Sequence, residues 1–281
     1  MSLASGSIGA DAPAVAFGKF AFANFASARY EMSKIYVQAP FTEKQLAQLR
    51  ELAAGYGDEL YFSPLRLSMS GLGFTEGGGK EPVSLSEVDA IIGNVPAGKL
   101  AKAQAAGELK LAWMQLNSSG ADAYAKEGIL PEHTVLTSAT GAYGTGIAEY
   151  MVCMLLNMMK RVPAYLEDQK RHLWTDEGIV TTPFGKRILI VGTGNIGMEF
   201  ARRMKAFGST LVGIRRRADH CPDGLDEIHA LSELKEEAAR ADVIAVSLPG
   251  TPQTYHLFNE ELLSSCREGA YFMNVGRGNV V

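Results

Sequence analysis

The chain has 281 residues, which corresponds to about two domains at roughly 150 residues each. Hydrophobic residues make up 47% and charged residues 21%, as in folded globular proteins and unlike disordered chains. The formal net charge is −4, from 27 basic and 31 acidic residues, so the chain as a whole does not attract polyanions. We therefore expect neither nucleic acid nor a membrane surface among its partners.

The three cysteines, Cys153, Cys221 and Cys266, lie far apart and form no CxxC pair. This spacing predicts neither a disulfide framework nor a zinc site, so we expect no metal and a reducing, cytoplasmic location. The longest apolar stretch, residues 147–159, is too short to span a bilayer and contains Glu149. We expect a core helix there.

Residues 1–31 are rich in Ala, Ser, Gly and Phe. Asp11 precedes the apolar residues and Lys19 interrupts them, which argues against a secretory signal. We expect a disordered extension, with Met32 as the natural start.

Short strands and helices alternate from Lys34 onward, which predicts a parallel sheet with helices on both faces. Thr42 and Gln45 have the spacing of a capping box before a leucine-rich helix that ends at Gly55. Pro40 is expected to close the first strand, and the glycine-rich residues 71–82 to form a loop or insertion. The strands of this half are predicted at residues 35–37, 59–62, 88–92, 109–116 and 135–137.

A second α/β pattern follows the apolar helix, and we expect the two domains to meet near residue 134. Helices are predicted up to Phe207, near residues 232–240, and after Asn259 as N-cap. The predicted fold class is therefore α/β, with domains at residues 32–134 and 135–281. The strands of the second domain are predicted at residues 187–191, 210–214, 243–248 and 270–275.

The sequence GTGNIG lies between a predicted strand and a predicted helix, with Gly192, Gly194 and Gly197 as its glycines. The first glycine permits a tight turn, the second lets the backbone approach a pyrophosphate, and the third lets helix and strand pack closely. The N–H groups and the dipole of the helix N-terminus, including Asn195 and Ile196, favour the anion. We predict a dinucleotide site, with a bare structural turn as the alternative.

The helix after this turn carries an apolar stripe at helical spacing. The stripe consists of Ile196, Phe200, Met204 and Phe207.

The residues that follow the second strand of this domain indicate which dinucleotide is preferred. An NAD site usually has Asp or Glu there, about 20 residues after the first glycine. This chain instead has Arg215, Arg216 and Arg217, whose guanidinium groups suit a 2′-phosphate. We predict NADP as the preferred cofactor, with NAD possible and a solvated basic loop as the alternative.

Five sequence blocks in a characteristic order now support a resemblance that runs from about Lys34 to the last residue. The blocks are residues 115–122 (QLNSSGAD), 141–149 (GAYGTGIAE), GTGNIG, 241–254 (ADVIAVSLPGTPQT) and 269–276, which continue into Arg277. In these blocks the chain resembles the D-isomer-specific 2-hydroxyacid dehydrogenases. The resemblance implies a flavodoxin-like substrate domain, a Rossmann NAD(P)-binding domain, and an active cleft between them.

The resemblance also implies roles for individual residues. Arg277 corresponds to the catalytic arginine that holds the substrate carboxylate and polarises the 2-oxo group, although an arginine after a strand is otherwise a surface residue. The N–H groups of Ser119 and Gly120 correspond to the carboxylate-binding loop, with an ordinary N-cap turn as the alternative. Ile147 corresponds to an apolar residue near the nicotinamide, or else belongs to the helix core. Pro249 and Thr254 correspond to residues beside the adenosine, and Val275 and Gly276 to residues beside the nicotinamide.

One departure from the family concerns proton transfer. The family's Glu and His lie downstream of the arginine, and this chain ends at Val281, four residues after Arg277. We therefore expect a truncated sequence that lacks the C-terminal part of the family fold, with an inactive natural fragment as the alternative. None of the five histidines is expected to substitute, and His256 matches a structural position. The other four are His133, His172, His220 and His229.

The resemblance implies an NAD(P)-dependent D-2-hydroxyacid dehydrogenase acting on a short 2-oxo acid, with glyoxylate or hydroxypyruvate as the first expectation. The alternative is a catalytically inactive, corepressor-like regulator that binds the dinucleotide. A homodimer is expected because the apolar helix at 147–159 lies where family members associate, although that helix is equally suited to an internal core.

Overall fold

A computed structural model describes residues 33–39, 41–62, 74–75 and 84–281. The predicted extension at 1–31, Met32, Pro40 and most of the predicted loop at 71–82 lie outside the described residues. The chain divides into two compact units, Met1–Ala142 and Tyr143–Val281. The division falls later than the predicted boundary near residue 134, because residues 135–137 pair with the first unit's sheet.

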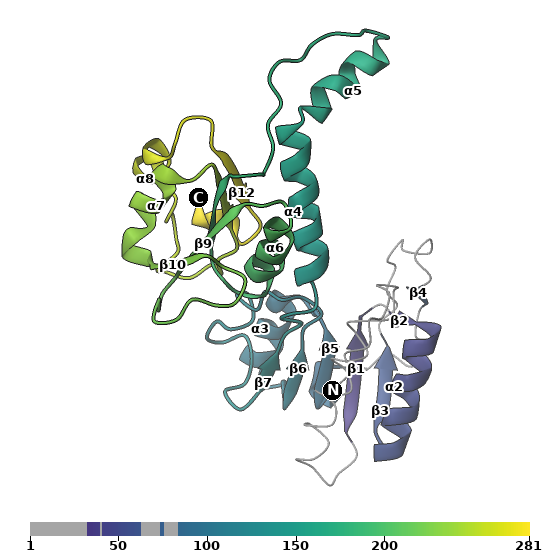
Figure 1. Ribbon diagram of the computed structural model, residues 1–281. Coiled ribbons are helices and arrows are strands. Elements are labelled where there is room, and N and C mark those ends of the chain that lie inside the picture. Colours follow the sequence, from purple (N-terminus) through teal and green to yellow (C-terminus); the bar gives the residue numbers. More distant parts are fainter. Residues whose placement is uncertain (1–32, 40, 63–73, 76–83) are drawn as a thin grey trace. The chain divides into compact units, whose positions relative to one another are not determined.

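The first unit contains a five-stranded parallel sheet in the order β3-β1-β5-β6-β7 (Figure 1). Counted along the chain, this order is 2-1-3-4-5, the flavodoxin-like arrangement that was predicted. The strands β5 and β6 are shorter than predicted. The bounds are β1 (Lys34–Gln38), β3 (Glu59–Phe62), β5 (Ala90–Gly93), β6 (Trp113–Gln115) and β7 (Val135–Thr137).

Helices cover the two faces of this sheet, as the burial of a parallel sheet requires. On one face, Ile35 packs with Leu46 of helix α2 (Glu43–Tyr56). On the other face, Ile91 packs with Leu100 of helix α3 (Ala97–Ala105). A 3-10 helix, η2 (Leu85–Glu87), precedes β5.

The predicted capping box at the start of α2 is confirmed. The Thr42 N–H donates to Gln45 Oε1 at 2.9 Å, and the Gln45 N–H donates to Thr42 Oγ1 at 3.3 Å. The helix continues past the predicted end at Gly55 and is capped by Gly57. Two short strands, β2 (Phe41–Thr42) and β4 (Phe74–Thr75), pair antiparallel, so the loop predicted at 71–82 is wrong at Phe74 and Thr75.

The second unit also has a five-stranded parallel sheet, in the order β10-β9-β8-β11-β12. Counted along the chain this is 3-2-1-4-5, the Rossmann order. Strand β10 was not predicted. The bounds are β8 (Arg187–Val191), β9 (Thr210–Arg215), β10 (Glu227–Ala230), β11 (Val243–Val246) and β12 (Tyr271–Asn274).

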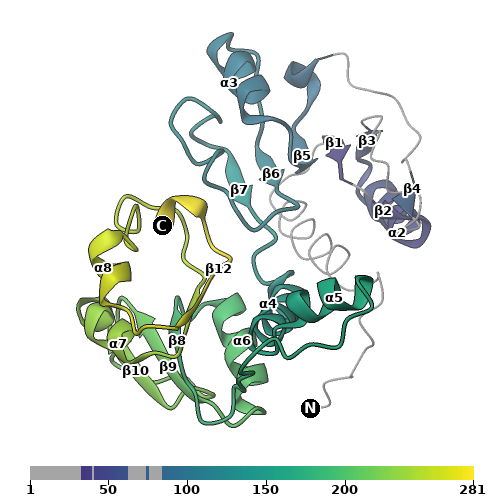
Figure 2. The ribbon, with the colours of Figure 1, turned by 90° about the horizontal axis from the view of Figure 1, so that it is seen from above.

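The helices of the second unit lie on both sides of its sheet (Figure 2). Helices α4 (Gly144–Met159) and α6 (Asn195–Lys205) cover one side, and α7 (Leu234–Arg240) and α8 (Glu260–Ser265) cover the other. Asn259 caps α8 as predicted, since its Oδ1 accepts from the Leu262 N–H at 3.0 Å. The remaining helices are α5 (Val162–Lys170), η3 (Leu231–Glu233) and η4 (Gly278–Val280).

The apolar stretch predicted as a core helix is α4. Its buried side chains Met151, Leu155 and Met159 pack in one cluster with Phe200 and Met204 of α6. The helix therefore contributes to the internal core of its own unit. Among the described residues, no helix combines the length and apolar character that crossing a membrane requires.

The predicted apolar stripe of α6 holds at Phe200 but is wrong at Phe207. The helix ends at Lys205, which leaves Phe207 37% exposed, whereas Phe200 is fully buried. We expect Phe200→Ala to lower the free energy of unfolding by about 3–5 kcal/mol, because it leaves a cavity in the core. Phe207→Ala serves as the control and should cost about 1 kcal/mol or less. Urea unfolding measures both, and equal losses would contradict this packing.

Candidate functional site

The carboxyl ends of the second sheet bring the predicted cofactor residues of this unit together. All five strands are parallel, so the loops after β8, β9, β11 and β12 leave the sheet at one edge. The strand order reverses at β8, which lies between β9 and β11, and ligands of such sheets bind at this switch point. The predicted residues on these loops, in the first turn of α6 and at the end of β9 are Gly192, Gly194, Asn195, Ile196, Gly197, Arg215, Arg216, Arg217, Pro249, Thr254, Val275, Gly276 and Arg277.

The turn between β8 and α6 shows why its glycines differ. Gly192 has a φ of 100°, and a Cβ there would lie 2.9 Å from the Ser247 carbonyl oxygen. A Cβ at Gly197 would lie 2.2 Å from the Gly192 carbonyl oxygen, so strand and helix approach only without it. A Cβ at Gly194 would meet no described atom within 4 Å. The protein's own packing therefore demands the first and third glycines and leaves space above the second.

Helix α6 begins at this open position. Gly194 is its N-cap, and among the described residues no side chain caps the helix there. The 11-residue helix directs its N–H groups and the positive end of its dipole to this point. The turn is also tied to the next loop, because Ser247 Oγ donates to the Gly192 carbonyl oxygen at 2.8 Å. The arrangement fits a diphosphate group.

Arg215 ends β9, and Arg216 and Arg217 follow it. All three side chains are exposed. Ala230 of β10 is the register partner of Arg215, so the basic turn lies beside the start of η3. Three exposed arginine side chains at this edge suit the 2′-phosphate that distinguishes NADP from NAD. They suit a solvated basic loop equally well.

The loop after β11 is held closed by Thr254. Its hydroxyl donates to the Pro249 carbonyl oxygen at 2.6 Å and accepts from the Thr251 N–H at 2.9 Å. This loop packs tightly on the one after β12, since a Cβ at Gly276 would lie 2.3 Å from the Leu248 carbonyl oxygen.

Arg277 is half-buried on the loop after β12. Its Nη1 donates to the Gly276 carbonyl oxygen at 3.0 Å. The loop continues the sheet for one residue, because the Val275 N–H donates to the Val246 carbonyl oxygen at 2.9 Å. Arg277 thus lies on the same sheet edge as the glycine-rich turn.

Ser119 and Gly120 follow β6 in the first unit. Asn94, which the sequence analysis did not single out, shapes this loop: its Nδ2 donates to Ser118 Oγ at 3.1 Å, and its Oδ1 accepts from the Asn117 N–H at 3.1 Å. Ser119 Oγ donates to the Ala139 carbonyl oxygen at 3.3 Å. The only local signal for Asn94 is its position directly after strand β5.

Ile147 lies in the first turn of α4, whose start packs against the start of α6, because a Cβ at Gly144 would clash with Asn195 Oδ1. Ile147 is half-buried and packs against the core formed by α4 and α6, in keeping with its alternative role. The His256 N–H donates to the Asn279 carbonyl oxygen at 2.9 Å, a structural contact of its backbone. His133, His172 and His220 are exposed.

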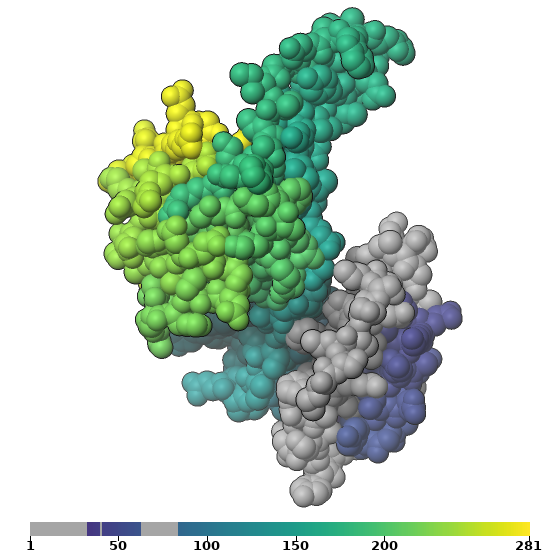
Figure 3. All heavy atoms as spheres, viewed as in Figure 1, coloured from purple at the N-terminus to yellow at the C-terminus, as the bar shows by residue number. Residues whose placement is uncertain are grey.

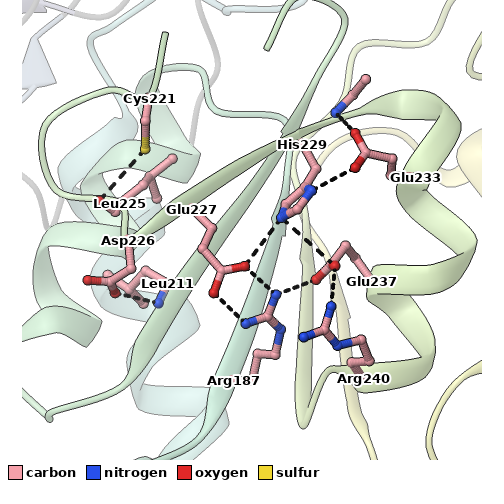
Figure 4. A network of polar contacts seen from close by, with 11 residues as sticks. Arg187, Leu211, Cys221, Leu225, Asp226, Glu227, His229, Glu233, Glu237 and Arg240 are labelled. Atoms are coloured by element: carbon pink, nitrogen blue, oxygen red, sulfur yellow. Dashed lines mark hydrogen bonds and ion pairs between the residues drawn. The ribbon is translucent and has the colours of Figure 1, made fainter. Parts of the chain in front are cut away.

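A polar network that the sequence analysis missed links β8, β10 and α7 (Figure 4). Arg187 donates to the Glu227 carboxylate at 2.8 and 2.6 Å and to Glu237 Oε2 at 2.5 Å. His229 Nδ1 lies 2.9 Å from Glu233 Oε1, and its Nε2 lies 3.2 Å from Glu227 Oε2. The hydrogen bonds from Arg187 hold the pKa of Glu227 at about 2.

Glu227, His229 and Glu237 each place one potential ligand atom within 4.8 Å of the others. The Arg187 guanidinium already supplies positive charge to both carboxylates, and Arg240 Nη1 donates to Glu237 at 2.9 Å. The network is therefore a set of ion pairs that joins the edge strand to α7.

The network predicts a pH-dependent contribution of His229 to stability. The hydrogen bond to Glu233, with further support from Glu227 and Glu237, raises the pKa of His229 above its ordinary value despite partial burial. A raised pKa stabilises the fold fully below the unfolded value of about 6.5, and this contribution is lost as the pH rises through the folded pKa. We expect His229→Gln to destabilise the protein more at pH 5.5 than at pH 8.5.

Urea unfolding at the two pH values measures this difference, with the exposed His220→Gln as the control. A loss of stability in His229→Gln that is the same at both pH values would contradict the proposed protonation.

Comparison with known proteins agrees with this fold. Residues 152–281 match the model of the D-isomer specific 2-hydroxyacid dehydrogenase, NAD binding domain. The chain is 28% identical over 183 residues to a D-lactate dehydrogenase of Streptococcus agalactiae, covering 62% of this chain and 53% of that protein. It is 32% identical over 181 residues to a D-3-phosphoglycerate dehydrogenase of Mycobacterium bovis, covering 63% and 33%.

A solved structure of a D-isomer specific 2-hydroxyacid dehydrogenase family protein from Aeromonas salmonicida is similar to most of this chain. The TM-score is 0.70 at 26% identity, over 89% of this chain and 75% of that one. The second unit, from residue 152 on, thus matches the NAD-binding domain of the D-isomer-specific 2-hydroxyacid dehydrogenases, and the chain is similar to members of that family. The chain spans about half the length of the first of these curated relatives.

Proposed function

We propose that the protein transfers a hydride between a nicotinamide dinucleotide and C2 of a short 2-oxo or 2-hydroxy acid. The observation that carries this proposal is the shared sheet edge: the glycine-rich turn after β8 and the Arg277 loop after β12 leave the same end of one Rossmann-type sheet. The match of residues 152–281 to the NAD-binding domain of 2-hydroxyacid dehydrogenases supports the reaction class. Glyoxylate and hydroxypyruvate are the substrates we would test first, together with pyruvate.

The residues of the turn fit the dinucleotide, because no described side chain caps the helix N-terminus at Gly194 or fills the space above it. In this proposal the turn binds the diphosphate, Pro249 and Thr254 lie beside the adenosine, and Val275 and Gly276 lie beside the nicotinamide. The bound nicotinamide supplies the hydride chemistry. The residues concerned in the turn are Gly192, Gly194, Asn195, Ile196 and Gly197.

The protein's own contribution is to bind and polarise the substrate. The planar guanidinium of Arg277 binds the substrate carboxylate and withdraws charge from the 2-oxo group, where negative charge develops. The backbone N–H groups of Ser119 and Gly120 bind the carboxylate in the same proposal. The proton-transfer Glu and His that the resemblance implies are assigned to no residue of this sequence.

A second copy of the chain is the proposed protein partner. Large apolar side chains are exposed on α5 and on the segment that follows it, including Leu166, Trp174 and Ile179. Figure 3 shows this segment standing out from the body of its unit. Since α4 buries one face in its own core, we place the predicted homodimer contact on the α5 region rather than on that face.

The arginine turn after β9 predicts a preference for NADPH. We expect Arg215→Asp to weaken NADPH binding by about 10- to 100-fold relative to NADH, because a charge-assisted hydrogen bond to the 2′-phosphate contributes about 1.5–3 kcal/mol. Titration calorimetry gives both dissociation constants, and the exposed Arg171→Asp controls for the change in net charge. An unchanged ratio in Arg215→Asp, Arg216→Asp and Arg217→Asp would exclude a role for this turn in cofactor choice.

Arg277→Ala tests the proposed reaction. We expect kcat/KM with glyoxylate or hydroxypyruvate to fall by about 10²–10³-fold, the usual cost of losing a group that stabilises developing charge. The dissociation constant of NADPH should stay within about twofold, since Arg277 acts on the substrate. Steady-state kinetics on the intact protein measure this, with Arg267→Ala as the control. Normal turnover by Arg277→Ala would show that the assigned role is wrong.

A further inference from the structure

The loop that carries Arg277 is closed by one side chain, Asn274, the last residue of β12. Its Nδ2 donates to the Arg277 carbonyl oxygen at 2.9 Å, and its Oδ1 accepts from the Gly276 N–H at 3.0 Å. A single amide therefore bonds to the residue before Arg277 and to Arg277 itself. None of the roles assigned above includes Asn274.

We propose that Asn274 is a positioning residue that fixes the direction of the Arg277 guanidinium toward the substrate. The inference rests on the proposed function, because it assigns Asn274 an effect on the reaction through Arg277. In the part of the chain that the structure describes, the Asn274 amide bonds the backbone groups of Gly276 and Arg277 and not the guanidinium, so its effect is indirect.

The chemistry of the loop explains why an amide is required. The side chain of Asn274 reaches one carbonyl oxygen and one N–H of the loop, so bonding both needs a donor and an acceptor on the same short side chain. Aspartate keeps the acceptor for the Gly276 N–H and replaces the donor with an oxygen that repels the Arg277 carbonyl. Alanine removes both bonds.

Two further contacts limit where the closed loop and the arginine side chain lie. Gly276 lies flat against the loop after β11, where a Cβ would be 2.3 Å from the Leu248 carbonyl oxygen. A Cβ at Gly250 would be 3.2 Å from Arg277 Cγ, so the arginine stem lies against the backbone of Gly250. Asn274 bonds the backbone of Arg277, and Gly250 lies against the aliphatic part of its side chain. Together these contacts restrict the conformations that the Arg277 side chain can adopt. Preorganisation of this kind governs rate, since a displacement of about 1 Å can cost about 10²-fold.

A purely structural role for Asn274 makes a different prediction. If Asn274 only secured the end of β12, its loss would lower stability and would reduce activity by the same factor whether or not Arg277 were present. If it acts through Arg277, its loss has no further effect once the guanidinium is gone.

The test is a double-mutant cycle on the intact protein with NADPH and glyoxylate or hydroxypyruvate. We expect Asn274→Ala to lower kcat/KM by about 10- to 100-fold, to keep the NADPH dissociation constant within about twofold, and to cause no further loss in the Arg277→Ala background. Asn274→Asp, which is nearly isosteric, should show the same pattern and carries the test if the alanine variant does not fold. Asn259→Asp, which retains a cap for α8, is the matched control.

Two results would overturn the inference: kcat/KM within about twofold of normal in Asn274→Ala and Asn274→Asp, or losses that multiply with the loss in Arg277→Ala. Failure of the proposed function is distinct from both. In that case Arg277→Ala itself keeps normal turnover, or the unaltered protein neither binds NADPH nor reduces a 2-oxo acid.

Discussion

The parallel pairing of β8 with β9 on one side and β11 on the other is the constraint on which the second unit depends. It sends the chain out of β8 between two neighbouring strands, into a turn that only glycine satisfies at Gly192 and Gly197. The same pairing aligns the ends of β11 and β12, so that Ser247 bonds the turn and Gly276 lies against Leu248. The position of the Arg277 loop therefore depends on contacts that lead from β8 through the loop after β11 to the loop after β12.

Local sequence patterns predict those parts of the fold that local interactions decide. The caps at Thr42 and Asn259 depend on residues three positions away, and the strand Arg187–Val191 is, after its first residue, a continuous apolar run rich in β-branched side chains; all three are confirmed. Strand β10 was missed because its Glu227 and His229 face charged partners from β8, η3 and α7 that no periodicity reveals. The end of α6 was misjudged at Phe207 for the opposite reason, since an apolar residue continues the stripe after the helix has ended.

In the candidate site, too, local sequence predicts some residues, and others depend on contacts made only in the folded chain. The glycine-rich turn and the basic turn after β9 follow from residue type and spacing, and the Arg277 and Ser119 roles come from the family resemblance. Asn94 and Asn274 were not found, because each is an asparagine at the end of a strand whose importance lies in which groups of a loop its amide reaches. Such bonds depend on how a loop closes in space. The same device, an amide that fixes a loop at the carboxyl edge of a parallel sheet, occurs in both units.

The central claim is that the sheet edge at β8 binds a dinucleotide and directs its nicotinamide toward the Arg277 loop. A crystal structure of the protein with NADPH tests this most directly. The account predicts diphosphate oxygens within hydrogen-bonding distance of the backbone N–H groups of Asn195 and Ile196, and the nicotinamide ring beside Val275 and Gly276. A diphosphate bound elsewhere, or a nicotinamide ring remote from that loop, would contradict it.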